Sequence, residues 1–323
     1  MPSENNENKA ATAVVRFRFW TSPAGSVVEV GPSHQSVDLP SVPLPVLREE
    51  LQDGPPSTDA IGRGVYDYLR QYPDCPHNLA YAELLRDAFP HFLADLGAQV
   101  AMLDHKEVDP LYVRRKITGM KILALLTPGN AGLWRQMGVA AFDLAMTFSQ
   151  LLQCRFHLLE GMGYLRRALK LDPNDAASLN YLAQIDYLLG DYPSAGERWQ
   201  RLCEGMDSPA VRQALAQKVE RISREEVPDH PVVDDLEAVG EALAACGHGE
   251  YEEAKLILER LEEEGTLPAE CPTSEFFYLL GLCRGKTGDL GSAFAAFEKA
   301  LELDPDYAPA QEGREMILDG REF

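Results

Sequence analysis

Few residues of this chain have the types and spacing that a reaction or a bound phosphate requires. The segment Gly281–Thr287, with the sequence GLCRGKT, resembles a phosphate-binding loop. Three residues separate its glycines, however, whereas the Walker motif needs four. The segment also falls where a helix and its turn are predicted, with no strand before it. The pattern therefore does not predict nucleotide binding.

Candidate metal ligands occur in two short segments, Cys75–His77 and Cys246–His248. A structural zinc site usually draws on two such pairs at a fixed spacing, and neither segment has a second pair at a usable distance. Asp104–His105 stands alone near a predicted helix end, and the sequence contains no H-E-x-x-H or G-x-S-x-G motif. We therefore predict no catalytic residue, no metal and no cofactor, and we do not expect an enzyme.

The charge of the chain is strongly acidic and unevenly distributed. The net charge is −21, and residues 131–323 hold 35 acidic and 18 basic side chains. Such a surface repels nucleic acid and anionic lipid, so we expect neither as a partner. It would attract a basic protein, although the charge could equally serve only to keep a helical array in solution.

The cysteines and the amino-terminal segment indicate a reducing compartment. The six cysteines are scattered, and the sequence contains no C-x-x-C pair. The first residues are polar, Arg16 and Arg18 interrupt the apolar run that follows, and no run of about 18 apolar residues occurs. We expect a cytoplasmic protein without a membrane segment.

The chain is expected to have three parts: residues 1–58, 59–130 and 131–323. Residues 1–10 read as a tail, and Thr12–Trp20 alternates between apolar and polar side chains before a turn and Val27–Val30. This pattern predicts a β-hairpin. Six prolines between residues 31 and 60 predict an extended arm without regular elements.

From residue 59 onward the pattern is that of successive helices. Apolar residues at helical spacing predict helices over Asp59–Tyr72, over Asn78–Leu103 with a break at Pro90, and from Pro110 to about Leu126. A long helix is predicted over Ala131–Cys154, with a partner over His157–Leu171.

An internal repeat provides the strongest signal. The sequence Phe277-x-x-Leu-Gly281 is followed by Gly288-Asp289, then by Ala293-x-x-x-Phe297-x-x-Ala300, then by Pro305. Small residues let two helices approach closely, large ones fill the space towards the next pair, and Gly288 can end a helix with φ > 0. The spacing predicts an inward stripe on helix 290–303 formed by Leu290, Ala293, Phe294, Phe297, Ala300 and Leu301.

This pattern resembles the tetratricopeptide repeat, with Phe277 for the usual Trp and Arg284 for the usual Tyr. Two weaker copies centre on Ala195 and Ala254. About 25 extra residues separate these two copies, which predicts an unpaired or irregular helix from Ser208-Pro209. The resemblance, over about residues 131–319, implies an all-α fold: a right-handed superhelical array of antiparallel helix pairs, preceded here by the β-hairpin and the extended arm.

The resemblance also implies a binding site. In this family the first helix of each pair lines a concave groove that holds a protein segment. The residues that would line it are Asn180, Tyr181, Gln184 and Tyr187, with Glu275, Tyr278, Leu282 and Lys286 in the last repeat. The alternative is that these tyrosines only pack between repeats. The acidic run from Glu250 to Glu264 is either a solvated face or a docking site for a basic partner.

The leading hypothesis is a non-catalytic, chaperone-like adaptor or scaffold that holds a protein or peptide partner in a helical groove. The first alternative is a structural protein that forms homo-oligomers through its repeats and its amino-terminal hairpin. An enzyme with an unmarked site is the least favoured reading.

Overall fold

The computed structural model describes residues 16–31, 35–51, 54–103 and 109–321, and the chain forms two compact units, residues 1–133 and 134–323. Each unit is described by itself. The tail at residues 1–10, part of the predicted hairpin strand and Asp104–His105 lie outside the described residues. In the described residues no helix is long and apolar enough to cross a membrane. The division into three parts stays a prediction.

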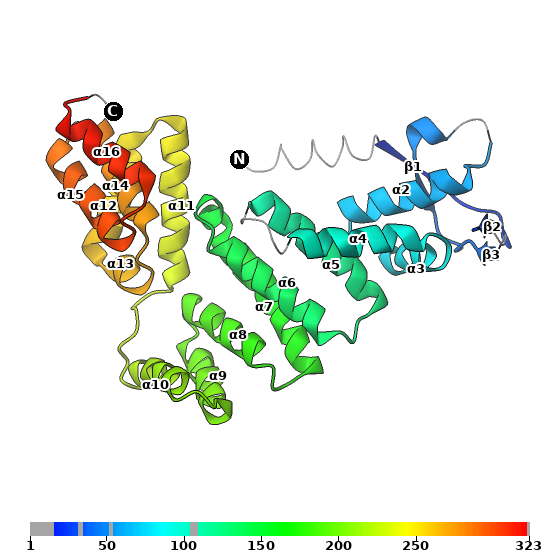
Figure 1. The fold of residues 1–323 in the computed structure, drawn as a ribbon, viewed down its shortest axis with the longest axis horizontal. Coiled ribbons are helices and arrows are strands. Elements are labelled where there is room, and N and C mark those ends of the chain that lie inside the picture. Colours follow the sequence, from blue (N-terminus) through cyan, green and yellow to red (C-terminus); the bar gives the residue numbers. More distant parts are fainter. Residues whose placement is uncertain (1–15, 32–34, 52–53, 104–108, 322–323) are drawn as a thin grey trace. The chain divides into compact units, whose positions relative to one another are not determined.

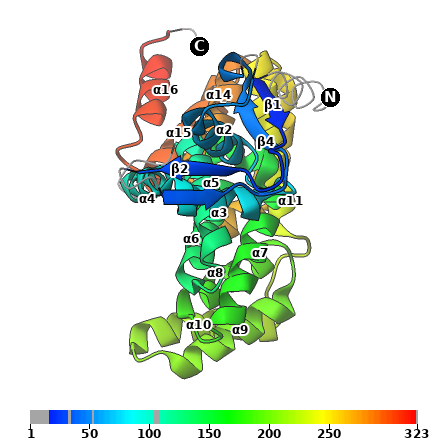
Figure 2. The same cartoon turned by 90° about the vertical axis from the view of Figure 1, so that its right-hand side faces the viewer.

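The first unit contains two small antiparallel sheets. β1 (Phe17–Trp20) pairs with β4 (Leu44–Leu47), and Figure 2 shows the two strands side by side. β2 (Val27–Val30) pairs with β3 (Gln35–Asp38). The predicted strands exist, but the prediction that they pair with each other is wrong. Two further strands also form inside the proline-rich arm, where no regular element was predicted.

The pairing of β1 with β4 follows from burial. All four residues of β4 are buried, and α2 (Thr58–Gln71) covers the strand so closely that a Cβ added at Gly64 would lie 2.3 Å from the carbonyl oxygen of Pro45. A buried strand needs a hydrogen-bonded neighbour, and β1 supplies it. Pro45 lies opposite Phe19 and is tolerated because each strand of a two-stranded sheet has a free edge.

The helices of the first unit begin and end close to the predicted positions. They are α2, α3 (Asn78–Ala88), α4 (Pro90–Leu103) and α5 (Pro110–Leu126), with a 3₁₀ turn η1 (Arg48–Glu50) before them. Pro90 separates α3 from α4, as expected for a residue that cannot continue a helix. The side chain of Asp109 caps α5 by accepting from the Leu111 amide at 2.8 Å.

The second unit consists of helices only. They are α6 (Ala131–Ala145), η2 (Phe148–Gln153), α7 (Cys154–Leu171), α8 (Ala176–Leu188), α9 (Tyr192–Gly205), α10 (Pro209–Ser223), α11 (Val232–His248), α12 (Tyr251–Glu264), α13 (Thr266–Glu270), α14 (Ser274–Lys286), α15 (Leu290–Leu303) and α16 (Ala308–Leu318). The predicted all-α array of helix pairs is confirmed.

The predicted long helix over Ala131–Cys154 is wrong, because α6 ends at Ala145 and the 3₁₀ turn η2 follows. The cause lies far away in the sequence. Helix α11 crosses this turn at Gly240, where an added Cβ would lie 2.2 Å from the backbone nitrogen of Leu152. In a continuous α-helix the side chains would keep the backbone of a crossing helix further away.

Helices α8, α9 and α10 form what we call the side branch, at one end of the second unit (Figure 1). The extra helix predicted from Ser208-Pro209 is α10, which packs on α9. The side branch has its own apolar cluster, centred on Trp199 and Leu215. After the side branch, the chain comes back to the helices that precede it, and α11 packs against η2 and α7.

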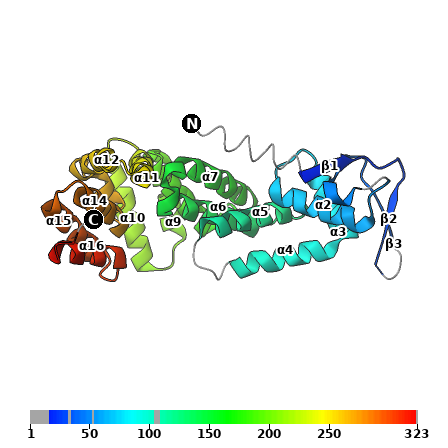
Figure 3. The ribbon, with the colours of Figure 1, turned by 90° about the horizontal axis from the view of Figure 1, so that it is seen from above.

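The last helices, α12 and α14–α16, pack around one another (Figure 3). Phe297 is fully buried, and Cβ atoms added at Gly281 and Gly313 would lie 2.7 and 2.6 Å from its ring. Gly288 has φ +87°, the left-handed conformation predicted for it. Leu290 is exposed, so its predicted place on the inward stripe is wrong.

Candidate functional site

The four candidate residues on α8 divide into two pairs. Asn180 accepts a hydrogen bond from the Trp199 indole at 3.2 Å, and Tyr181 packs edge-on against Phe142 with ring centroids 5.2 Å apart. These contacts hold helices together. Gln184 and Tyr187, one turn further along, line a pocket instead.

This pocket, which we call the α8 pocket, has a volume of about 280 Å³. Residues on α8, α9 and α10 and at the ends of α6 and α13 line it. Its lining residues are Phe142, Met146, Gln184, Tyr187, Leu188, Trp199, Lys218, Arg221, Ala269, Glu270 and Cys271. Apolar walls with a few converging polar groups are typical of binding sites.

The polar groups of the α8 pocket form one connected set. The Tyr187 hydroxyl donates to Glu270 Oε2 at 3.0 Å, and Arg221 Nη2 donates to Glu270 Oε1 at 2.6 Å. Burial raises the pKa of Tyr187, and the Glu270 carboxylate raises it further, so this hydroxyl stays protonated and remains a donor. Tyr187 and Arg221 thus hold the Glu270 carboxylate in place in the pocket.

Lys218 is the remaining cation of the α8 pocket. Its Nζ lies 4.7 Å from the centroid of the Trp199 ring, and burial lowers the pKa of its ammonium group, with Arg221 adding repulsion. No carboxylate lies within 4.0 Å of Lys218 among the described residues. The pocket therefore combines two cations with one carboxylate, and that carboxylate already pairs with Arg221.

Sequence reasoning missed the residues that α10 and α13 contribute. α13 carries Glu270 into the pocket, and no helix was predicted there. α10 was expected, but none of its residues was among the groove candidates. The signal available for Lys218 was its spacing on α10, three residues from Leu215 and Arg221, which places it near the face that packs on α9.

The four candidates on α14 do not line the α8 pocket. Tyr278 packs against Phe297 and Tyr307, and Leu282 lies half-buried on the apolar core. Glu275 accepts from Ser274 Oγ at 3.3 Å, and Lys286 Nζ lies 5.6 Å from the Tyr251 ring centroid. Their role in binding stays a prediction.

Part of the acidic run from Glu250 to Glu264 is engaged within the fold. Arg284 donates to Glu259 at 3.0 Å and to Glu262 at 2.8 Å, and Lys299 donates to Glu262 at 2.6 Å. The two cations lower the pKa of Glu262 in spite of its partial burial. Arg284, which replaces the Tyr usual in this repeat, thus joins α14 to α12.

One group of described residues brings possible metal ligands together. Donor atoms of His230, Asp235 and Glu264 lie within 4.8 Å of one another, and His230 Nε2 lies 2.8 Å from Asp235 Oδ1. Glu264 is exposed and His230 half-exposed.

Cys246, a candidate metal ligand in the sequence, faces Cys283 instead, with a sulfur–sulfur distance of 3.2 Å.

Comparison with known proteins identifies the repeat. Residues 274–307 match the tetratricopeptide repeat family, so the predicted resemblance is confirmed over these residues. Over 135 residues the chain is 32% identical to Protein FlbA of Caulobacter vibrioides. The matched region covers 41% of this chain and 20% of FlbA. The chain therefore spans about a fifth of the length of that relative.

Two solved structures are similar to the chain at low identity and low TM-score. A tetratricopeptide repeat protein from Parabacteroides merdae is 13% identical, over 80% of this chain and 92% of that one, with a TM-score of 0.27. A thermophilic tetratricopeptide-repeat protein from Thermus thermophilus is 18% identical, over 56% and 98%, with a TM-score of 0.23.

Proposed function

We propose that this tetratricopeptide-repeat protein is a non-catalytic scaffold that holds a segment of a partner protein in the α8 pocket. The observation that carries the proposal is the convergence of Gln184, Tyr187 and Lys218 on an apolar pocket within the helical array. A glutamine amide can bond a peptide backbone, and the aromatic walls supply apolar area.

The charges of the α8 pocket indicate the chemistry of the segment. Glu270 is paired with Arg221, which leaves the Lys218 ammonium group available to a carboxylate. The sequence allowed for a basic partner on the acidic run, but Glu259 and Glu262 already pair with Arg284 and Lys299. We therefore expect an apolar side chain next to an acidic one in the bound segment.

Quantitative binding tests this proposal. Partners are captured from a native lysate, the bound segment is mapped to a synthetic peptide, and its Kd is measured by fluorescence anisotropy. We expect Gln184→Ala with Lys218→Gln to weaken the peptide at least tenfold, because both polar contacts are lost. Gln136→Ala with Lys170→Gln, at exposed positions on α6 and α7, is the matched control.

Equal Kd values in the two double variants would place the interface elsewhere, for example on α14. Sedimentation velocity of the purified chain addresses the alternative of self-assembly. A large homo-oligomer without any partner, unaffected by the α8 pocket variant, would favour that alternative.

A further inference from the structure

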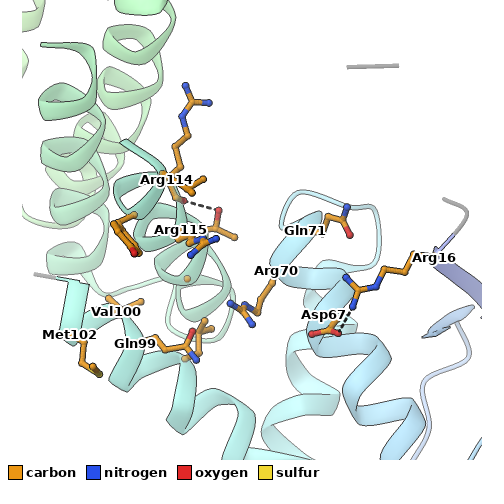
Figure 4. A pocket seen from close by; sticks show the side chains of 14 residues that line it. Arg16, Asp67, Arg70, Gln71, Gln99, Val100, Met102, Arg114 and Arg115 are labelled. Carbon is orange, nitrogen blue, oxygen red and sulfur yellow. Dashed lines mark hydrogen bonds and ion pairs between the residues drawn. The ribbon is translucent and has the colours of Figure 1, made fainter. Parts of the chain in front are cut away.

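The first unit contains a pocket of about 740 Å³ between α2, α4 and α5, which Figure 4 shows. We call it the arginine pocket. Its lining residues are Arg16, Asp67, Arg70, Gln71, Leu96, Gln99, Val100, Met102, Leu111, Tyr112, Arg114, Arg115, Thr118 and Gly119. The volume lies in the range typical of small-molecule sites, about 300–1,000 Å³.

The cations of this pocket are all arginines. Four of them line it, against one lining carboxylate among the described residues, Asp67, which pairs with Arg16 at 3.6 Å. Arg70 and Arg115 have no carboxylate within 4.0 Å in the part of the chain that the structure describes. The planar guanidinium group offers paired donors that match phosphate oxygens in a bidentate manner, which an ammonium group cannot do.

Aromatic rings hold two of these guanidinium groups in place. The Arg70 guanidinium carbon lies 5.2 Å from the Tyr66 ring centroid, and that of Arg115 lies 5.7 Å from the Tyr112 ring centroid. Stacking on a ring satisfies the face of the group and leaves its N–H edge for a ligand.

The local charge contrasts with the charge of the whole chain. The net charge is −21, but exposed charges separated by more than about 8 Å are largely screened at physiological salt. An anion between Arg70 and Arg115 therefore experiences these two guanidinium groups more strongly than the distant acidic surface. A cluster of this kind within a strongly acidic protein is not needed for solubility.

One wall of the pocket is apolar. Leu96 and Val100 are buried on α4, and a Cβ added at Gly119 would lie 2.7 Å from Val100 Cγ2, so α4 and α5 are in close contact below the pocket. Met102 is 64% exposed and Leu111 55%, so both present apolar surface at the pocket. A ligand with an apolar or aromatic part next to its acidic groups would cover both.

We propose that the arginine pocket binds a nucleoside diphosphate. The diphosphate lies between Arg70 and Arg115, whose guanidinium groups point toward each other in Figure 4, and the base lies against Tyr112 and the apolar wall. A concave pocket of this volume favours a small organic phosphate over an extended acidic peptide, which would need a longer groove. This proposal is independent of the α8 pocket.

Isothermal titration calorimetry with ADP and with inorganic pyrophosphate tests the proposal. The double variant Arg70→Gln with Arg115→Gln removes two guanidinium groups from the pocket. The control, Arg63→Gln with Arg86→Gln, makes the same charge change at exposed arginines of the same unit that do not line the pocket. A second variant, Gln99→Glu, leaves every arginine in place and adds a repelling charge. Thermal melting confirms that each variant is folded.

We expect ADP to bind the wild type and to bind the pocket double variant and Gln99→Glu at least tenfold more weakly, with the control within about twofold. Raising the salt from 50 to 200 mM weakens binding. Pyrophosphate binds less tightly than ADP, because it lacks the base.

Three results would overturn the proposal. The first is the absence of saturable binding of both probes to the wild type. The second is an equal loss in the control, which would assign the binding to overall charge. The third is tighter binding of a hexaglutamate peptide than of ADP to the same arginines, which would make the pocket a protein contact. Pyrophosphate binding as tightly as ADP would refute the role given to Tyr112 and the apolar wall.

Discussion

Replacement of Gly240 by alanine tests the crossing of α11 over the 3₁₀ turn η2. The added Cβ would lie 2.2 Å from the backbone nitrogen of Leu152 and 2.6 Å from its Cα. Backbone atoms cannot rotate away, so α11 or the turn must move by about 1 Å. Overpacking of this kind typically costs about 1–3 kcal/mol, and here we expect the upper end. Alanine in a helix regains about 1 kcal/mol relative to glycine.

The net expectation is that Gly240→Ala lowers the free energy of unfolding by about 2 kcal/mol. For a unit of this size the Tm falls by about 4–8 °C. Urea unfolding followed by circular dichroism measures the first quantity and a thermal melt the second. Gly163→Ala, on α7 with nothing within 4 Å of the added Cβ, is the control and is expected to stabilise by about 0.5–1 kcal/mol.

A further variant distinguishes the cause. Leu152→Ala combined with Gly240→Ala is not expected to restore stability, because the obstacle is the backbone of Leu152 and not its exposed side chain. Rescue by that change, or a Gly240→Ala protein as stable as the wild type, would refute the crossing described above.

Three other predictions concern the second unit. Phe297→Ala, at a fully buried ring, is expected to cost about 3–5 kcal/mol in urea unfolding; a loss under 1 kcal/mol would contradict the packing of α14–α16. Burial raises the pKa of Asp186 to about 6, against the pull of Arg198, so the folded state holds this proton more tightly than the unfolded state. The stability gained from that proton is full below pH 4 and is lost as the pH rises to about 6. Wild type should therefore lose on the order of 2 kcal/mol more than Asp186→Asn between pH 4 and 6, and parallel curves would exclude the shift. A hydrogen bond with Cys283 lowers the pKa of Cys246, so diamide should join the two sulfurs, now 3.2 Å apart, with a mass loss of about 2 Da. No cross-link at this pair would contradict that geometry.

The sequence predicted what depends on short-range patterns. The helix pair at 274–303 could be predicted because Gly281, Phe297 and Gly288 determine its packing and its turn within about one repeat length. The end of α6 could not be predicted, because the turn η2 that follows it packs against Gly240, in a distant part of the chain. The strand pairing failed for a similar reason: β4 is recruited by burial under α2, which outweighs the local proline signal.

The two pockets show a second limit of sequence reading. Gln184 and Tyr187 were predicted from the resemblance, but Lys218 and Glu270 come from helices outside the regular repeat. The arginine pocket could not be predicted, because its four arginines come from segments that are far apart in the sequence. Arg16 and Arg70 come from different elements than Arg114 and Arg115, and only folding brings all four to one pocket.

The return of the chain from the side branch has a consequence for the order of folding. In a regular repeat array each helix pair contacts its neighbour in sequence, so folding can spread from one pair to the next. Here the Arg155 amide donates to Glu237, 82 residues away, at 3.1 Å. Closing a loop of that length costs about 4 kcal/mol in chain entropy. We therefore expect α6–α10 and α11–α16 to fold as two blocks that join last, and hydrogen exchange to report the seam between α11 and η2 as the first place to open.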